Sequence, residues 1–250
     1  MSLYDAIFSR TSCRKFSGEA VSEDRLVHLE KYLSLIRALD PKIRTRFVLL
    51  RTRETGERPS GHFVVKAPYY LVLYSEKAER SAENAGYLME QAVLYLTVYG
   101  VATCYQGAAN ASSLPQAPEG MKPVITVAFG MPAKVSSGRS KRKKTEDICT
   151  FREGAGAPVR KIVEAARVAP SALNRQPWFL VAGPARIHVF CRPTPFLKGQ
   201  ELDCGIALLH LMLAAEEEWF TPKAVRVKKL PDNLPPRMKY IGTVLLETIE

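Results

Sequence analysis

The chain has 250 residues, of which 46% are hydrophobic, and a formal net charge of +11 at pH 7. That is enough apolar material for one large domain or two small ones. No run of 18 apolar residues occurs, and the first residues lack the continuous apolar stretch of a secretory signal. We therefore expect a cytoplasmic protein with no membrane partner.

The cysteines, histidines and basic residues argue against several classes of protein, namely disulfide-bonded, metal-binding and nucleic-acid-binding proteins. The five cysteines are scattered and form no Cys-x-x-Cys pair, so they indicate reduced thiols rather than disulfides or a zinc site. No two histidines have metal-ligand spacing, and we expect no metal. Much of the positive charge lies in residues 139–144, which contain no aromatic residue that could stack on a base. We interpret this run as a solvated linker and expect no nucleic-acid partner.

The first part of the chain predicts an α+β unit. Leucine and isoleucine at helical spacing, after Ser22 as a cap, predict a helix over residues 22–38. The elements that follow are strands at 46–50 and 69–74, a long helix at 82–99 that stops at Gly100, and a strand at 123–129.

The second part predicts the same order of elements. We expect a helix at 158–168, strands at 178–181 and 187–190, a long apolar helix at 203–219, and a strand at 240–246. The basic, glycine- and serine-containing stretch 133–144 separates the parts, which gives halves of 1–138 and 139–250. The alternative is a chance likeness of two generic α+β units. Both long helices are apolar on most faces, so the simplest packing sets them against each other with pseudo-two-fold symmetry.

Two motifs carry the candidate chemistry. Arg10-Thr11-Ser12-Cys13-Arg14-Lys15-Phe16 offers two guanidinium groups and two hydroxyls within five residues, which suits a phosphate monoester. Pro170-Ser171-Ala172-Leu173-Asn174-Arg175-Gln176-Pro177-Trp178 offers a hydroxyl and an amide on a proline-bounded turn, followed by an apolar anchor. Such a turn suits the polar edge of a flat heterocycle.

Together the motifs resemble those of the FMN-binding nitroreductase family, which has an Arg-x-Ser-x-Arg/Lys-x-Phe start and a Pro-Ser-x-x-Asn-x-Gln-Pro-Trp segment. In that family both lie close together in one half-length unit that forms obligate homodimers; here they are about 160 residues apart. The chain is similar to a subfamily built from two fused half-units. The resemblance implies an α+β, nitroreductase-like fold, a tandem duplication of two α/β sandwich units packed as a pseudo-dimer. It also implies a monomer.

The resemblance assigns residues to an FMN site. Its phosphate side comprises Arg10, Thr11, Ser12 and Arg14 from the first half, with Arg142 or Lys143 from the basic segment that follows the last strand of that half. A backbone N–H of Gln106 or Gly107, in the loop 103–107, is expected at flavin N5. The second half is expected to supply the wall of the ring through Pro170, Ser171, Ala172 and Asn174, while Gln176 and Trp178 brace the turn and the core. The converse residues of a second site are missing, which favours one FMN per chain.

The implied activity is an FMN-dependent oxidoreductase. It would use NAD(P)H to reduce nitro compounds or quinones by ping-pong hydride transfer through flavin N5. No catalytic acid–base side chain is required, and no Gly-x-Gly-x-x-Gly motif distinguishes NADH from NADPH. The alternatives are another flavin reaction, such as dehalogenation or flavin fragmentation, and an FMN-binding protein without turnover.

Overall fold

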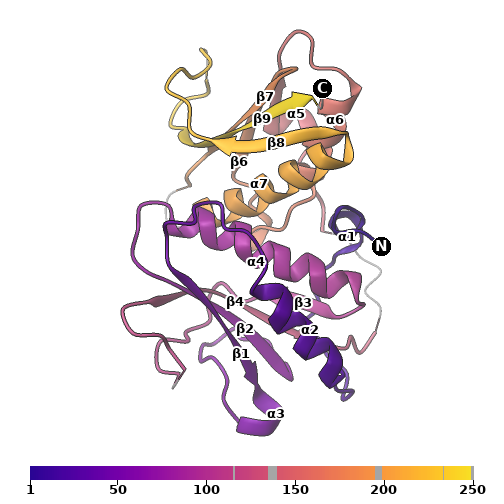
Figure 1. Ribbon diagram of the computed structural model, residues 1–250, viewed down its shortest axis with the longest axis vertical. Coiled ribbons are helices and arrows are strands. Elements are labelled where there is room, and N and C mark those ends of the chain that lie inside the picture. The colour runs from indigo at the N-terminus through magenta and orange to yellow at the C-terminus, as the bar shows by residue number, and fades with distance from the viewer. Residues whose placement is uncertain (115, 135–139, 195–198, 233, 249–250) are drawn as a thin grey trace. The chain divides into compact units, whose positions relative to one another are not determined.

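The chain divides into two compact units, Met1–Arg139 and Ser140–Glu250 (Figure 1). The computed structural model describes residues 1–114, 116–134, 140–194, 199–232 and 234–248. Part of the predicted linker, 135–139, lies outside these ranges, whereas residues 140–144 belong to the second unit. None of the described helices combines the length and the apolar character needed to cross a bilayer.

The first unit is built on a four-stranded antiparallel sheet in the order β1-β2-β4-β3. Its strands are β1 (Thr45–Arg51), β2 (Tyr69–Ser75), β3 (Ala102–Tyr105) and β4 (Lys122–Gly130), and its helices are α1 (Leu3–Ser9), α2 (Glu23–Leu33), α3 (Thr52–Thr55) and α4 (Ser81–Val98). All seven residues of β2 are buried, which explains its continuous apolar sequence. One buried cluster of this unit includes Val48, Tyr70 and Val72.

The second unit has a five-stranded sheet in the order β5-β6-β7-β9-β8, in which β5 runs parallel to β6 and the other pairs are antiparallel. The strands are β5 (Cys149–Phe151), β6 (Trp178–Ala182), β7 (Arg186–Cys191), β8 (Phe220–Val225) and β9 (Lys239–Thr248). The helices are α5 (Thr145–Ile148), α6 (Ala157–Arg167), η1 (Ala172–Asn174) and α7 (Gln200–Glu217).

The two units repeat one plan. Strands β1-β2-β4-β3 correspond in order to β6-β7-β9-β8, and the long helix follows the second of these strands in both units. Figure 1 shows α4 across one face of the first sheet. The predicted α+β duplication is therefore confirmed, whereas the packing of the halves as a pseudo-dimer stays a prediction.

The predicted elements match the observed ones closely, with one early ending. Helix α2 stops at Leu33 instead of continuing to residue 38, because the Ser34 hydroxyl donates to the Lys31 carbonyl at 2.7 Å. Leu35 beyond it is 68% exposed. Helix α4 ends as predicted, since Gly100 has the left-handed φ of 72° that a helix stop requires.

The two tryptophans lie in contrasting surroundings of the second unit. Trp178 begins β6, is 2% exposed, and its indole N–H has no hydrogen-bond partner in the structure. Trp219 lies between α7 and β8, is 81% exposed, and has a left-handed φ of 65°. Trp178 therefore anchors the core, as the sequence predicted, whereas Trp219 projects from a strained turn.

Candidate flavin-binding site

The N-terminal motif runs beside strand β3 in the first unit. After α1, the Cys13 N–H donates to the Thr103 carbonyl at 2.9 Å, and Ser12 forms a parallel bridge with Thr103. Phe16 then bridges to Pro132 and packs over Gly130, where an added Cβ would lie 3.3 Å from the Phe16 ring. These contacts bring the motif next to the loop 103–107, as its predicted role requires.

Arg10 is the most constrained member of this motif. It is only 8% exposed, its Nε atom has no hydrogen-bond partner, and this atom lies 4.0 Å from a carboxylate oxygen of Glu90. Glu90, on α4, is fully buried and accepts a hydrogen bond from the Tyr105 hydroxyl at 2.6 Å. A buried guanidinium nitrogen without a partner is rare in folded proteins, so a ligand acceptor would satisfy it.

The other motif residues are more accessible than Arg10. Thr11 and Ser12 are half-buried and Arg14 is exposed. The positive charge of Arg14 acts on Cys104: burial raises the pKa of that thiol, and Arg14 is the largest of the effects that oppose the rise. The motif therefore presents a buried cation, two hydroxyls and an exposed cation along one short segment.

Gln106 and Gly107 differ in what they can offer a ligand. The Gln106 backbone N–H donates to the Thr126 carbonyl at 2.8 Å, and its side-chain oxygen accepts from the Val65 N–H at 2.8 Å. Its side-chain nitrogen donates to the carbonyls of Cys104 and Tyr105, each at 3.1 Å. Gln106 thus braces the loop from within, whereas Gly107 is exposed, and a Cβ built on it meets no atom within 4 Å.

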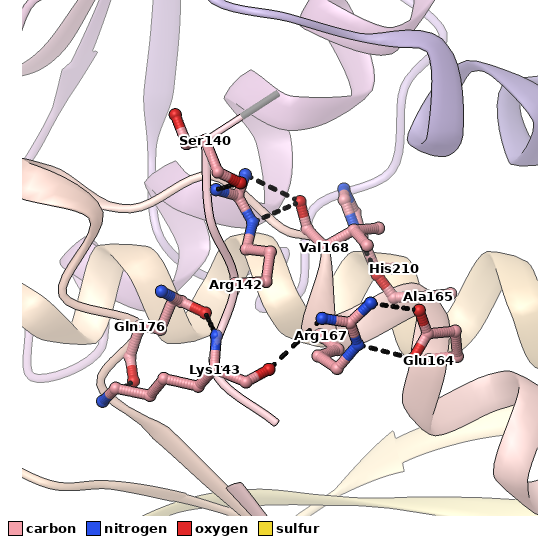
Figure 2. A network of polar contacts seen from close by, with 9 residues as sticks. All are labelled: Ser140, Arg142, Lys143, Glu164, Ala165, Arg167, Val168, Gln176 and His210. Carbon is pink, nitrogen blue, oxygen red and sulfur yellow. Dashed lines mark hydrogen bonds and ion pairs between the residues drawn. The ribbon is translucent and has the colours of Figure 1, made fainter. Parts of the chain in front are cut away.

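The basic segment after the linker is bonded to the second motif, inside the second unit (Figure 2). Arg142 Nη1 donates to Asn174 Oδ1 at 2.8 Å. Arg142 Nε and Nη2 donate to the Val168 carbonyl at 3.3 and 3.0 Å, as Figure 2 shows. The Asn174 amide nitrogen donates to the Lys141 carbonyl at 2.7 Å. The Arg142 guanidinium is therefore held by a turn of the second unit, and its contribution to the phosphate side stays a prediction.

Lys143 bonds to the same turn of the second unit. Its backbone N–H donates to Gln176 Oε1 at 2.8 Å and its Nζ to the Gln176 carbonyl at 3.1 Å. Burial lowers the pKa of Lys143, and the positive charge of Arg192 adds to this effect. Gln176 is itself 3% exposed and donates to the Asn174 carbonyl at 3.0 Å. The predicted bracing role of Gln176 is therefore confirmed.

The turn formed by residues 171–176 has an unusual backbone. Leu173, Asn174 and Gln176 have φ values of 50°, 55° and 50°, a left-handed conformation that non-glycine residues rarely adopt. Pro170 is buried before it, the Ser171 hydroxyl accepts from the Gln176 N–H at 2.9 Å, and the Ala172 N–H donates to the Asp203 carboxylate. A strained conformation this fully supported is typical of a binding turn.

The fold and these motifs define the nitroreductase class of α+β proteins. The structure is similar to a crystal structure of a putative nitroreductase from Thermotoga maritima MSB8, at 24% identity and a TM-score of 0.71, over 98% of this chain and 93% of that one. The nitroreductase family protein of Streptococcus pneumoniae TIGR4 is similar at 15% identity and a TM-score of 0.50, over 60% of this chain and 100% of that one.

The chain belongs to the family described as Putative TM nitroreductase, whose model matches residues 2–215. A nitroreductase with bound FMN from Bacteroides fragilis NCTC 9343 is a more distant structural relative, at 16% identity and a TM-score of 0.46, over 58% of this chain and 95% of that one. No curated protein sequence is significantly similar to this chain.

Two acidic residues that contact the two motifs were not identified as site residues from the sequence. Glu90 and Asp203 are acidic residues within long apolar helices, and both are buried, at 0% and 3% exposure. A carboxylate in such a helix is costly to bury and is therefore a signal in itself. Which motif each one faces depends on tertiary contacts that the helical pattern does not contain.

Proposed function

We propose that the protein is an FMN-dependent oxidoreductase that uses NAD(P)H to reduce nitro compounds or quinones. The observation that carries the proposal is the buried guanidinium of Arg10, whose Nε has no hydrogen-bond partner, in a chain of the nitroreductase family. Ser12 and the exposed Arg14 follow it on the same segment. A buried cation with adjacent hydroxyls is suited to a phosphate.

The donor set of the first unit fits FMN. Arg10 would bind the phosphate from the interior, Thr11 and Ser12 would donate hydroxyls to it, and Arg14 would place positive charge at the N1/O2 edge of the ring. Gly107 is the better candidate for the backbone donor at N5, because the Gln106 N–H already donates to Thr126. Bound FMN would supply the hydride transfer at N5 between NAD(P)H and the acceptor.

The turn of the second unit would form a wall for the ring. In this proposal Pro170, Ser171 and Ala172 line it, with Ala172 exposed. Asn174, Arg142 and Lys143 bond mainly to one another and to the turn, so they would support the wall more than they contact the cofactor. Such mutual bracing keeps a binding surface preorganised before the ligand arrives.

Further parts of the proposal follow from the split of the motifs along the sequence. The phosphate motif belongs to the first unit and the Pro-Ser-x-x-Asn motif to the second, and neither unit has both. We therefore propose one FMN per chain and a monomeric protein. Separately, we propose a location in the cytoplasm, from the scattered cysteines, which indicate reduced thiols.

The test is spectroscopic and uses the intact protein. FMN titration should produce a bound flavin spectrum with one equivalent per chain. NADH or NADPH, added without oxygen, should then bleach the flavin absorbance, and a nitroaromatic or quinone should restore it. Tight FMN binding without bleaching would favour the binding protein without turnover. Bleaching that no nitro compound or quinone reverses would favour another flavin reaction, and failure to bind FMN would refute the proposal.

A further inference from the structure

Asp203 is a buried carboxylate directed at the backbone of the 171–176 turn. It lies in the first turn of α7 and is 3% exposed. The Ala172 N–H donates to both of its oxygens, at 3.2 Å to Oδ1 and 3.1 Å to Oδ2. Across the ranges that the structure covers, Asp203 forms no ion pair, so the Ala172 N–H is its principal compensation for leaving water.

Keeping a carboxylate at this position is costly. Burial raises the pKa of Asp203 to about 7, and only the Ala172 N–H acts against the rise. The titratable neighbours of Asp203 supply no positive charge. Glu201, also on α7, has the same charge as Asp203 and pairs with Lys239 at 3.0 Å. Burial raises the pKa of the Cys204 thiol, and the neighbouring Cys191 and Asp203 raise it further. An apolar residue here would avoid this cost, so the carboxylate needs a reason.

The turn supplies that reason, because the other backbone bonds of its first half stay within the turn: the carbonyls of Ser171 and Ala172 accept from the N–H groups of Asn174 and Arg175 at 3.0 and 3.1 Å. Leu173 is 79% exposed and has a left-handed backbone, so apolar packing does not fix it. Arg142 bonds to Asn174 in the second half of the turn, and the Ser171 hydroxyl, which accepts from the Gln176 N–H, ties the first half to the second. Ala172 precedes the first left-handed residue, and its N–H is bonded to Asp203. Asp203 thus fixes the point where the strained conformation begins.

We propose that Asp203 is the positioning residue of the 171–176 turn, acting as the acceptor that holds the Ala172 N–H and with it the left-handed stretch that follows. Its consequence for cofactor binding rests on the proposed function, since this turn is the proposed wall of the FMN ring. A residue that merely filled space in α7 would not need to accept this hydrogen bond.

The experiment follows the Ala172 amide by NMR in the cofactor-free protein, in wild type, Asp203→Ala, Asp203→Asn and the control Glu217→Gln at the exposed far end of α7. In Asp203→Ala the Ala172 amide should exchange with solvent on the order of tenfold faster or more, because a bond to a charged acceptor is lost. Asp203→Asn retains an acceptor oxygen and should restore protection, and Glu217→Gln should match wild type.

A pH titration gives a readout that simple packing would not move and that does not depend on Asp203→Ala folding. In wild type the Ala172 amide shift should titrate with a midpoint near the Asp203 pKa of about 7, and in Asp203→Asn it should not. Unchanged Ala172 exchange in Asp203→Ala, or a titration that persists in Asp203→Asn, would overturn the proposal.

The affinity for FMN separates this inference from the proposed function. If both hold, Asp203→Ala weakens FMN binding and Asp203→Asn recovers it. If wild type binds no FMN while the Ala172 results are as expected, the proposed function fails and the positioning role stands. If wild type binds FMN and Asp203→Ala changes neither Ala172 exchange nor affinity, the positioning role fails and the proposed function stands.

Discussion

The buried guanidinium of Arg10 provides a direct test of the phosphate assignment through Arg10→Ala. The Arg10 side chain is 5% exposed, so water screens its interactions weakly. A charge-assisted bond to a phosphate at such a site contributes about 1.5–3 kcal/mol. Since about 1.4 kcal/mol corresponds to tenfold in affinity, the dissociation constant for FMN should rise about 10- to 150-fold.

Glu90 moves this expectation toward the upper end of the range. Its carboxylate lies 4.0 Å from Arg10 Nε, so removal of the guanidinium leaves its repulsion of an anionic ligand less balanced. Arg10→Lys keeps the charge but loses the planar fork, and should fall between wild type and Arg10→Ala.

The assay is FMN titration by fluorescence quenching or calorimetry at fixed salt. Arg25→Ala is the matched control, because it removes the same charge from an exposed position on α2 of the same unit. Circular dichroism would establish that the variants are folded. An Arg10→Ala protein that is folded and binds FMN as wild type does would refute the assignment, whereas a loss shared by Arg25→Ala would reveal only a general charge effect.

Three further outcomes are expected. Arg142→Ala removes the bonds to Val168 and Asn174 and should lower the free energy of unfolding by about 1–3 kcal/mol. Thermal unfolding measures this loss against the control Arg186→Ala, at an exposed position; equal melting temperatures of the two variants would contradict the bracing role of Arg142. The pKa of Asp203, raised from 3.8 to about 7 by burial, means that the folded state holds a proton that the unfolded state has lost between these values. The stability that this group contributes should therefore fall by about 1.4 kcal/mol per pH unit as pH rises toward 7 and then level off. Urea unfolding of wild type and Asp203→Asn from pH 5 to 8 measures this fall; an equal pH dependence of the two unfolding free energies would contradict it. Light scattering should give the 27.9 kDa mass of one chain, and calorimetry one FMN per chain; a concentration-independent dimer or two sites would exclude the one-site monomer.

The long elements were predictable because each buries a continuous or periodic apolar face. Strand β2 and helix α4 begin and end within one residue of their predicted limits. Several short elements lack that signal. Strand β5 has three residues, one of them the exposed Thr150, and β8 contains Pro222 at the edge of its sheet, a position where proline is tolerated but where sequence patterns argue against a strand.

The site was predictable where a motif is contiguous and not where bonds join distant segments. Residues 10–16 could be identified as a phosphate motif from one contiguous stretch, and the structure places this stretch beside the loop 103–107. The bond between Arg142 and Asn174 joins residues 32 positions apart. It depends on how α6 and β6 place the turn, which no local pattern encodes, so the bond from Arg142 to this turn was not predicted.

The contrast between the two tryptophans makes the protein its own optical reporter. Trp219, at 81% exposure, should emit at long wavelength and be quenched readily by acrylamide, whereas Trp178, at 2%, should emit at shorter wavelength and resist quenching. Trp178 follows the 171–176 turn by two residues, so Trp219→Phe would leave a single tryptophan, which can be excited selectively at roughly 295 nm or above, at the base of that turn. Its emission would then report, without any attached dye, whether the turn is ordered.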